Sequence, residues 1–481
     1  MILLLQNDLL YDYDIRTLLQ AFFDNEKIVT TPEDTRMSME VTFQGMGPHK
    51  VCFRSPEGET YSRVFNGDYT DKMLLRNTVK KNVYEILCEY TKRTLPWGTL
   101  TGIRPVKIVT GMLEDGMTEQ EAQDLFQKTY LTSTQKAAIS TKVAKKERVI
   151  LSQLDYENQY SLYIGIPFCP STCLYCSFTS YPIAVYKDVV EEYLKALFKE
   201  IAYAANAMQH KQLVSIYIGG GTPTSLTADQ LERLIQEIVN HFPMEEVREF
   251  TVEAGRPDSI TFDKLKVLYH SPVTRISINP QTMQDDTLRL IGRAHNVQQT
   301  IEAYQMAREI GFDNINMDMI VGLPGEEIAE VKDTLQRIAE LKPDNLTVHS
   351  LALKRAANLT QKRSEYESLI KGSTNEMLEE ADRVAASMGL EPYYLYRQKN
   401  IPGNLENVGY ALPGKEGIYN ILIMEEKQTI IALGAGASSK YVFSSEDRIE
   451  RTENVKDVKL YISRIDEMIE RKEKMLKNKQ P

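Results

Sequence analysis

The chain has 481 residues, of which 42% are hydrophobic and 26% charged, a composition typical of a globular protein with more than one domain. Five cysteines are too few for a disulfide-stabilised secreted protein, and we find neither a signal peptide nor an apolar run of membrane length. The net charge of −10 gives the chain no general attraction to nucleic acid. We therefore expect a cytoplasmic protein with no membrane or nucleic-acid partner.

The first 155 residues mix short strands and helices. The opening "MILLLQNDLL" and the later "MEVTFQG" and "HKVCFRS" are predicted strands, and helices are expected around residues 74–92 and 118–128. This mixture predicts an N-terminal α+β domain over residues 1–155.

The stretch "TLPWGTLTGIRPVKI" (residues 94–108) contains Trp97, the only tryptophan. Its mixed aromatic and basic composition is compatible with two roles. It covers the mouth of the following domain, or it packs elements of its own domain together.

Three cysteines then fall within eight residues. "GIPFCPSTCLYCSF" places Cys169, Cys173 and Cys176 in a C-x3-C-x2-C pattern directly after the predicted strand "SLYIGIPF". A structural zinc site needs four ligands, and the remaining cysteines, Cys52 and Cys88, lie far upstream. Three thiolates on one loop suit three irons of a [4Fe–4S] cluster whose fourth iron is open to a small molecule. The alternative is three buried thiols without metal.

Strands and helices alternate regularly after the cysteines. Predicted strands follow at residues 214–226, 249–254, 275–281, 314–325 and 345–353, with helices at 190–206, 228–240, 297–310 and 328–341. This alternation predicts a parallel sheet in a barrel or half-barrel over residues 156–390. Polar or glycine residues recur where the strands end, as in a site at the carboxyl face.

Beyond residue 390, "YNILIMEE" and "TIIALGAGASS" are predicted strands, and residues 455–476 form a charged helical pattern. They predict a small C-terminal α+β domain over residues 391–481.

The cysteine loop, "GGGTPT" (residues 219–224) and "DMIVGLPG" (residues 318–325) together carry a family resemblance. Over residues 160–440 the chain resembles radical S-adenosylmethionine (SAM) enzymes, specifically the oxygen-independent coproporphyrinogen III dehydrogenase family and its HemZ-like branch. The resemblance implies an α/β fold, a partial parallel (β/α)6 barrel flanked by an N-terminal α+β domain and a small C-terminal domain. It also implies a [4Fe–4S] cluster and one or two SAM molecules.

The resemblance assigns a role to each matching position. Cys169, Cys173 and Cys176 match the cluster ligands. SAM contacts are implied for Tyr163, Tyr175, Phe178, Gly220, Gly221, Thr222 and Glu253, and Gln281, Arg293 and Asp318 match positions that hold a second SAM.

The activity implied by the resemblance belongs to heme biosynthesis. An oxidoreductase of this family decarboxylates two propionates of coproporphyrinogen III to vinyl groups without oxygen, giving protoporphyrinogen IX, with flavodoxin or ferredoxin as electron donor. Guanidinium groups bind such carboxylates bidentately. The candidate substrate contacts are Arg104, Arg256, Arg355 and Arg397, with Arg293 as a further possibility; each is otherwise an ordinary surface arginine.

Several departures from the dehydrogenase pattern keep alternatives open. Phe178 stands where the dehydrogenases carry an extra cysteine, Asn279 and Pro280 replace small residues, and the N-terminal arm motif is missing. HemW-like heme chaperones share the aromatic residue at Phe178, but their His-Asn-Pro motif is absent here; His349 is the candidate heme ligand. A radical SAM methyltransferase that acts on heme is a third alternative.

Overall fold

The computed structural model describes residues 1–23, 26–32, 35–45, 47–68, 70–102, 104–354, 356–398, 401–443 and 448–477. The chain divides into two compact units. The N-terminal unit comprises Met1–Lys145, Ser373–Asn375 and Leu395–Glu406, and the barrel unit comprises Lys146–Gly372, Glu376–Tyr394 and Asn407–Pro481. The domain boundaries expected at residues 155 and 390 stay predictions.

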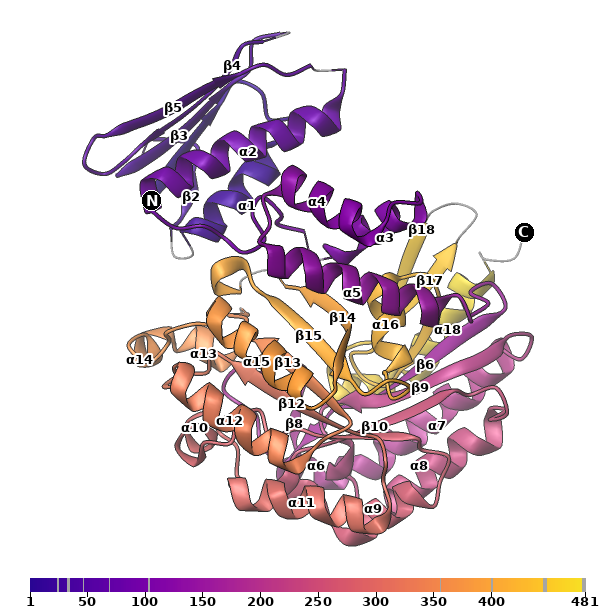
Figure 1. Cartoon of the computed structure of the whole chain (residues 1–481). Helices are drawn as coiled ribbons and strands as arrows, with labels where there is room; N and C mark the ends of the chain where they lie inside the picture. The colour runs from indigo at the N-terminus through magenta and orange to yellow at the C-terminus, as the bar shows by residue number, and fades with distance from the viewer. Residues whose placement is uncertain are drawn as a thin grey trace. The chain divides into compact units, whose positions relative to one another are not determined.

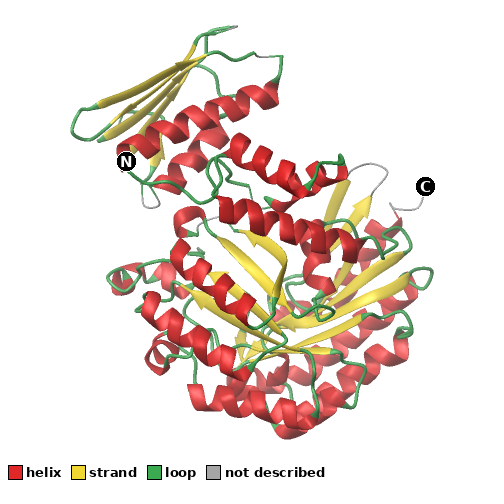
Figure 2. Ribbon diagram, viewed as in Figure 1, coloured by secondary structure: helices red, strands yellow, loops and turns green. Residues whose placement is uncertain are grey.

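The N-terminal unit is built on a five-stranded sheet in the order β2-β1-β3-β4-β5. Its strands are β1 (Ile2–Gln6), β2 (Ile28–Val29), β3 (Met37–Thr42), β4 (His49–Arg54) and β5 (Thr60–Phe65). Buried and more exposed residues alternate along β3 and β4, so one face of the sheet is covered. Helices α1 (Asp12–Phe22) and α2 (Lys72–Thr91) lie beside the sheet (Figures 1 and 2). Their apolar side chains join those of the strands in one core.

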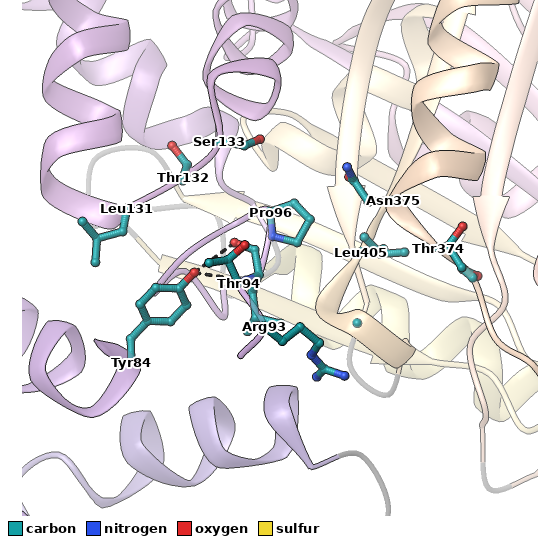
Figure 3. Close-up of a pocket in the computed structure, with 13 residues that line it drawn as sticks. Tyr84, Arg93, Thr94, Pro96, Leu131, Thr132, Ser133, Thr374, Asn375 and Leu405 are labelled. Atoms are coloured by element: carbon teal, nitrogen blue, oxygen red, sulfur yellow. Dashed lines mark hydrogen bonds between the residues drawn. The ribbon is translucent and has the colours of Figure 1, made fainter. Parts of the chain in front are cut away.

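Trp97 is fully buried within this same unit. Its indole N–H donates to Glu406 Oε2 at 2.7 Å, and the Lys136 ammonium forms an ion pair with the same carboxylate. The residues just before Trp97 line a pocket of about 670 Å³, where the Tyr84 hydroxyl bonds the backbone of Leu95 (Figure 3). This burial favours the packing role for the Trp97 segment. Helices α3 (Val106–Glu114), α4 (Glu119–Tyr130) and α5 (Thr134–Leu151) follow it.

The barrel unit is built on one mixed sheet in the order β14-β15-β13-β12-β11-β10-β9-β6-β16-β17-β18, of which only the end of β14, from Leu395, and the first residue of β15, Glu406, are counted with the N-terminal unit. Its strands are β6 (Gln159–Ile166), β9 (Gln212–Gly220), β10 (Glu249–Gly255), β11 (Arg275–Ile278), β12 (Ile315–Val321), β13 (Asn345–Ser350), β14 (Glu391–Arg397), β15 (Glu406–Ala411), β16 (Thr429–Leu433), β17 (Ser438–Phe443) and β18 (Arg448–Glu453). The run from β16 through β6 and β9 to β13 is parallel. The six strands predicted between residues 161 and 353 are therefore confirmed as one parallel series. In the part of the chain that the structure describes, the sheet does not close, so the fold is a partial barrel.

Helices cover the outer face of this curved sheet (Figures 1 and 2). They include α7 (Val190–Ala207), α8 (Ala228–His241), α9 (Phe262–Tyr269), α11 (Val297–Ile310) and α12 (Ile328–Leu341). On β6, Leu162, Ile164 and Ile166 are fully buried, whereas Tyr163 belongs to the opposite face because strand side chains alternate. The sheet thus has an apolar face under the helices and an inner face that carries the polar residues.

The sequence specifies the helix ends through local hydrogen bonds. Helix α11 begins after Asn296, whose side chain accepts a hydrogen bond from the Gln299 amide. The Gln299 side chain in turn accepts from the Asn296 amide. It ends at Gly311, whose φ of 119° is a left-handed conformation that favours glycine. The predicted helix at residues 297–310 is therefore confirmed to the residue. Among the described residues, no helix combines the length and apolar character needed to cross a membrane.

The predicted strand "YNILIMEE" is wrong, because these residues form helix α16 (Ile418–Glu425). A short apolar run does not separate a buried strand from a buried helix by its periodicity. Here Tyr419, Ile421, Leu422 and Glu425 are buried, which is helical spacing.

The residues expected to form a C-terminal domain add to the sheet and to its outer layer. Strand β16 pairs directly with β6, and α17 (Val458–Ser463) and α18 (Ile465–Lys477) contact α7. A buried network joins these parts: Glu200 of α7 accepts from Lys472 Nζ at 2.7 Å, from the Tyr461 hydroxyl at 2.6 Å and from the Gly434 amide at 2.8 Å. Lys472 and Glu200 are both inaccessible to solvent.

The first prediction concerns this ion pair. Lys472→Met should destabilise the folded protein by about 3 kcal/mol or more, because it leaves the buried Glu200 carboxylate without its cation. Lys474→Met is the matched control. Lys474 pairs with Glu470 on the exposed face of the same helix, and such pairs contribute about 1 kcal/mol or less. Thermal unfolding followed by circular dichroism measures both; equal transition temperatures for the two variants would contradict the assignment.

Candidate active site at the carboxyl ends of the parallel strands

The cysteine loop leaves the carboxyl end of β6 and is held by backbone contacts. The Leu174 amide donates to the Ile291 carbonyl at 2.9 Å, and the Ser171 hydroxyl donates to the Gly292 carbonyl at 2.8 Å. Cys173 is buried and Cys169 and Cys176 are half-buried, all three as free thiols. The loop is thus fixed against Ile291 and Gly292, which lie between β11 and α11.

The glycine motif at the end of β9 lies against this loop. A Cβ on Gly221 would stand 2.6 Å from the Phe168 carbonyl oxygen and 3.0 Å from Cys169 Sγ, so only glycine fits there without displacement. The next residue, Thr222, donates its hydroxyl to Cys169 Sγ at 3.5 Å. The strand pairing of β6 with β9 therefore brings the predicted SAM motif into contact with the predicted cluster loop.

The three thiols suit a cationic group. Burial raises the pKa of Cys169 to about 11 and also raises the pKa of Cys176, so neither is a stable thiolate at neutral pH without a cation. No three His, Cys, Asp or Glu side chains in the described ranges converge on a position for a single metal ion. Thiols that each bind a separate iron of a cluster fit this spacing better than a mononuclear zinc site does.

Glu253, near the end of β10, points to the inner face beside the glycines. Tyr217 of β9 donates its hydroxyl to Glu253 Oε1 at 2.5 Å, and the Gly220 amide also bonds the carboxylate. A Cβ on Gly219 would lie 2.8 Å from Glu253 Oε2, and one on Gly220 would lie 3.1 Å from the Tyr163 hydroxyl. Burial raises the pKa of Glu253 to about 7, more than the Tyr217 hydrogen bond lowers it.

Asp318 of β12 carries a second carboxylate on the inner face. Asn316 Nδ2 donates to Asp318 Oδ1 at 2.6 Å, and His349 Nε2 of β13 lies 3.9 Å from Oδ2. Burial raises the pKa of Asp318, but His349 and Asn316 outweigh it and hold the pKa below its usual value. Asp318 is therefore an anion at neutral pH.

The segment after β11 is strained and leaves buried polar atoms. Gln281 has a φ of 68°, a left-handed conformation that is uncommon outside glycine, and its backbone bridges to Asp318 and Ile320 of β12. The side-chain oxygens of Gln281 and Asn279 are buried without a hydrogen-bond partner among the described residues. Strain and orphaned acceptors together mark a position shaped for a ligand.

Arg293 is buried close to the cysteine loop. Its Nη1 donates to the backbone carbonyls of Asn279 and Pro280, and it lies beside Cys173 and Tyr175. Its Nε is buried and has no hydrogen-bond partner in the described part of the chain. Burial raises the pKa of the neighbouring Tyr175, which therefore stays a neutral hydrogen-bonding group.

The other predicted residues are dispersed. Phe178 is 68% exposed, with the Lys354 ammonium 5.4 Å from its ring centroid. Arg256 contacts the cysteine loop. Arg397 lies in the N-terminal unit, where it donates to the backbone of Leu100, Gly102 and Asn404; Arg104 lies in the same unit, and Arg355 lies outside the described residues.

Sequence reasoning missed two aromatic residues of the inner face. Tyr217 and Tyr419 stack with centroids 4.6 Å apart, and Tyr217 also stacks with Tyr163 at 6.2 Å. Tyr217 stands two residues before Gly219, so strand alternation alone could have placed it beside Glu253. Tyr419 could not be placed, because its segment was taken for a strand.

Comparisons with known proteins agree with this geometry. Residues 163–338 match the model of the Radical SAM superfamily. The oxygen-independent coproporphyrinogen-III oxidase-like protein HemZ of Bacillus subtilis is 42% identical over 425 residues, covering 87% of this chain and 85% of its own length. The heme chaperone HemW of the same organism is 34% identical over 64% of this chain and 76% of its own length.

Among solved structures, the radical SAM coproporphyrinogen III oxidase HemN of Escherichia coli matches with a TM-score of 0.54 at 23% identity, over 67% of this chain and 72% of its own. This likeness shows the fold. The extent of the match to HemZ shows the family. The chain therefore belongs to the HemZ-like branch of the oxygen-independent coproporphyrinogen III oxidase family, whose radical SAM domain binds a [4Fe–4S] cluster and S-adenosylmethionine.

Proposed function

We propose that this protein oxidatively decarboxylates coproporphyrinogen III to protoporphyrinogen IX without oxygen. The observation that carries the proposal is Arg293, a fully charged guanidinium buried beside Cys173 with an unpartnered Nε. The guanidinium already donates Nη1 to two backbone carbonyls, but a buried cation is best satisfied by an anion, and a carboxylate could accept from its remaining Nε. Such a group would hold a carboxylate near the position where hydrogen is abstracted.

The proposed cluster ligands are Cys169, Cys173 and Cys176. A cluster and SAM held there would supply, on reduction, a radical able to remove a hydrogen atom from the substrate. The chain's own groups would hold SAM in place: the Gly220–Thr222 backbone would contact its methionyl part, and the Glu253 carboxylate would accept from the amino group. Tyr163 and the exposed Phe178 offer aromatic surface for the remainder.

The charges of the inner face suit this division of roles. Glu253 and Asp318 are carboxylates that would repel propionates, and they suit the cationic amino and sulfonium groups of SAM. Arg293 bonds the carbonyls of Asn279 and Pro280, whereas the backbone of Gln281 bonds Asp318 and Ile320 of β12. Arg293 therefore binds a carboxylate of either the tetrapyrrole or a second SAM.

A heme carrier is the second candidate, favoured by the 34% identity to HemW. His349 is the histidine of the inner face that would serve as an axial ligand, and its neighbour Asp318 lies 3.9 Å away. Heme titration separates the two functions. A carrier binds heme stoichiometrically and loses a heme ligand in His349→Ala, whereas an oxidase leaves heme unbound.

The second prediction tests the reaction. Reconstituted protein incubated anaerobically with SAM, dithionite and coproporphyrinogen III should yield protoporphyrinogen IX, identified by mass after oxidation. Recovery of unchanged substrate alongside SAM cleavage would contradict the proposal. A product that has gained a methyl group would instead identify a methyltransferase.

The third prediction concerns the cluster ligands. Replacement of Cys169, Cys173 or Cys176 by alanine should abolish SAM cleavage, because each thiolate binds one iron and the cluster is lost with any of them. Cys52→Ala and Cys88→Ala, in the N-terminal unit, are the matched controls and should keep wild-type iron content. Four irons per chain in the triple alanine variant would refute the assignment.

The fourth prediction concerns pH. The pKa of Glu253 is raised to about 7, so the carboxyl is neutral below that pH and charged above it. If the carboxylate binds the SAM amino group, SAM affinity should rise by about tenfold between about pH 6 and pH 8, the change in ionised fraction over that range. Equilibrium dialysis of iron-loaded protein measures it. Glu253→Gln should remove the dependence and the exposed Glu302→Gln should retain it; a flat wild-type profile would exclude this role.

The fifth prediction separates the two carboxylates that Arg293 can bind. If the partner is a propionate, Arg293→Gln should weaken coproporphyrin binding by about 2 kcal/mol or more, which is roughly thirtyfold. If the partner is a second SAM, porphyrin affinity should stay normal while bound SAM falls from two to one. The control is Arg289→Gln, which replaces an exposed arginine of the short helix α10 (Asp285–Leu290) just before Arg293. Unchanged binding of both ligands would leave Arg293 a structural residue.

A further inference from the structure

Arg256 lies just beyond β10 and is 3% exposed. Its Nε donates to Asp258 Oδ1 at 3.0 Å and its Nη2 donates to Asp258 Oδ2 at 2.6 Å, a bidentate pair across one edge of the guanidinium. This pair fixes the plane of the guanidinium.

The remaining nitrogen of Arg256 points to the cysteine loop. Nη1 donates to the Ser171 carbonyl at 3.0 Å, to the Ser171 hydroxyl at 2.7 Å and to Cys173 Sγ at 3.8 Å. One side chain thus contacts the loop between the first and second cysteines and the sulfur of the second. A lysine could not reproduce this, because its ammonium is a single point and not a planar fork.

The turn that contains Arg256, Asp258 and Ser259 is held by several contacts. The Ser259 amide and hydroxyl both donate to the Arg256 carbonyl, at 3.0 Å and 2.8 Å, and Ser259 Oγ lies 2.6 Å from Thr224 Oγ1 of the glycine motif. His295 Nδ1 lies 3.7 Å from Asp258 Oδ1. The turn that carries Arg256 is therefore tied to the strand end that carries Thr222, which contacts Cys169.

We propose that Arg256 is a positioning residue that clamps the cysteine loop and stabilises negative charge on the Cys173 sulfur, thereby raising the reduction potential of the cluster. Hydrogen bonds to ligand sulfurs and a nearby positive charge favour the reduced, more negative cluster. This role replaces the propionate contact expected for Arg256 from the sequence, because the guanidinium is already occupied by Asp258 and Ser171. It depends on the cluster and not on which tetrapyrrole is the substrate.

The test is a redox titration of the reconstituted full-length protein, followed by electron paramagnetic resonance of the reduced cluster. Arg256→Gln should disfavour reduction by about tenfold, which for a one-electron couple is about 59 mV towards more negative potential. Arg256→Lys should also shift the reduction potential to more negative values, because a lysine keeps the positive charge but lacks the planar guanidinium that contacts both Asp258 and the cysteine loop. Arg233→Gln, an exposed arginine of α8 that pairs with Glu191 and Asp229, is the matched control and should keep the wild-type potential.

The reduction potential separates a positioning role from a merely structural one. A structural residue would lower the unfolding temperature of its variants and leave the potential of the clusters that form unchanged, and that result would overturn the proposal. Unchanged potential with weaker coproporphyrin binding would instead restore the substrate role. Where Arg256→Gln retains too little iron to titrate, Asp258→Asn decides the matter: it keeps the sulfur donor but releases its anchor, and a wild-type potential with a wild-type spectrum there would refute the clamp.

Discussion

Parallel pairing from β16 to β13 is the constraint on which the site depends. Seven strands run in one direction, so their carboxyl ends meet at one edge although more than 100 residues separate Cys169 from Asp318 along the chain. The register is equally strict: Ile166 pairs with Gly220, which sets Gly221 against the cysteine loop. A slip of one residue would turn Tyr217 and Glu253 towards the helices and bring their apolar neighbours inward.

Buried charge is distributed unevenly along this edge. Two guanidinium groups, those of Arg256 and Arg293, contact the cysteine loop, whereas the carboxylates of Glu253 and Asp318 lie on the inner face of the sheet. Each charge that lies away from water has partners or a candidate ligand, as burial requires. The arrangement offers electrostatic complementarity to a ligand that carries both a cation and a carboxylate.

Local chemistry explains how much of this could be predicted from the sequence. Helix α11 was predictable because Asn296, Gln299 and Gly311 specify its ends, and the inner-face residues follow from strand alternation beside named motifs. The roles of arginines were not predictable, since a guanidinium serves a substrate, a backbone carbonyl or a sulfur equally well. Arg397 illustrates this: it donates to the backbone carbonyls of Leu100, Gly102 and Asn404, and the first two lie almost 300 residues away along the chain, so no local pattern reveals them. Helix α16 was missed because its apolar run is short, and a short apolar run fits a buried strand as well as a helix.

The pairing of β16 with β6 has a consequence for how the protein is made. The neighbour that completes one side of β6 comes from residues 429–433, and Lys472, which neutralises Glu200 of α7, follows it by about forty positions. During synthesis the early strands therefore leave the ribosome with one edge of β6 uncovered, and the Glu200 carboxylate does not yet have Lys472 as its partner. Exposed strand edges favour association with other chains. The completed core of this unit therefore depends on residues near the end of the chain, which are the last to be made.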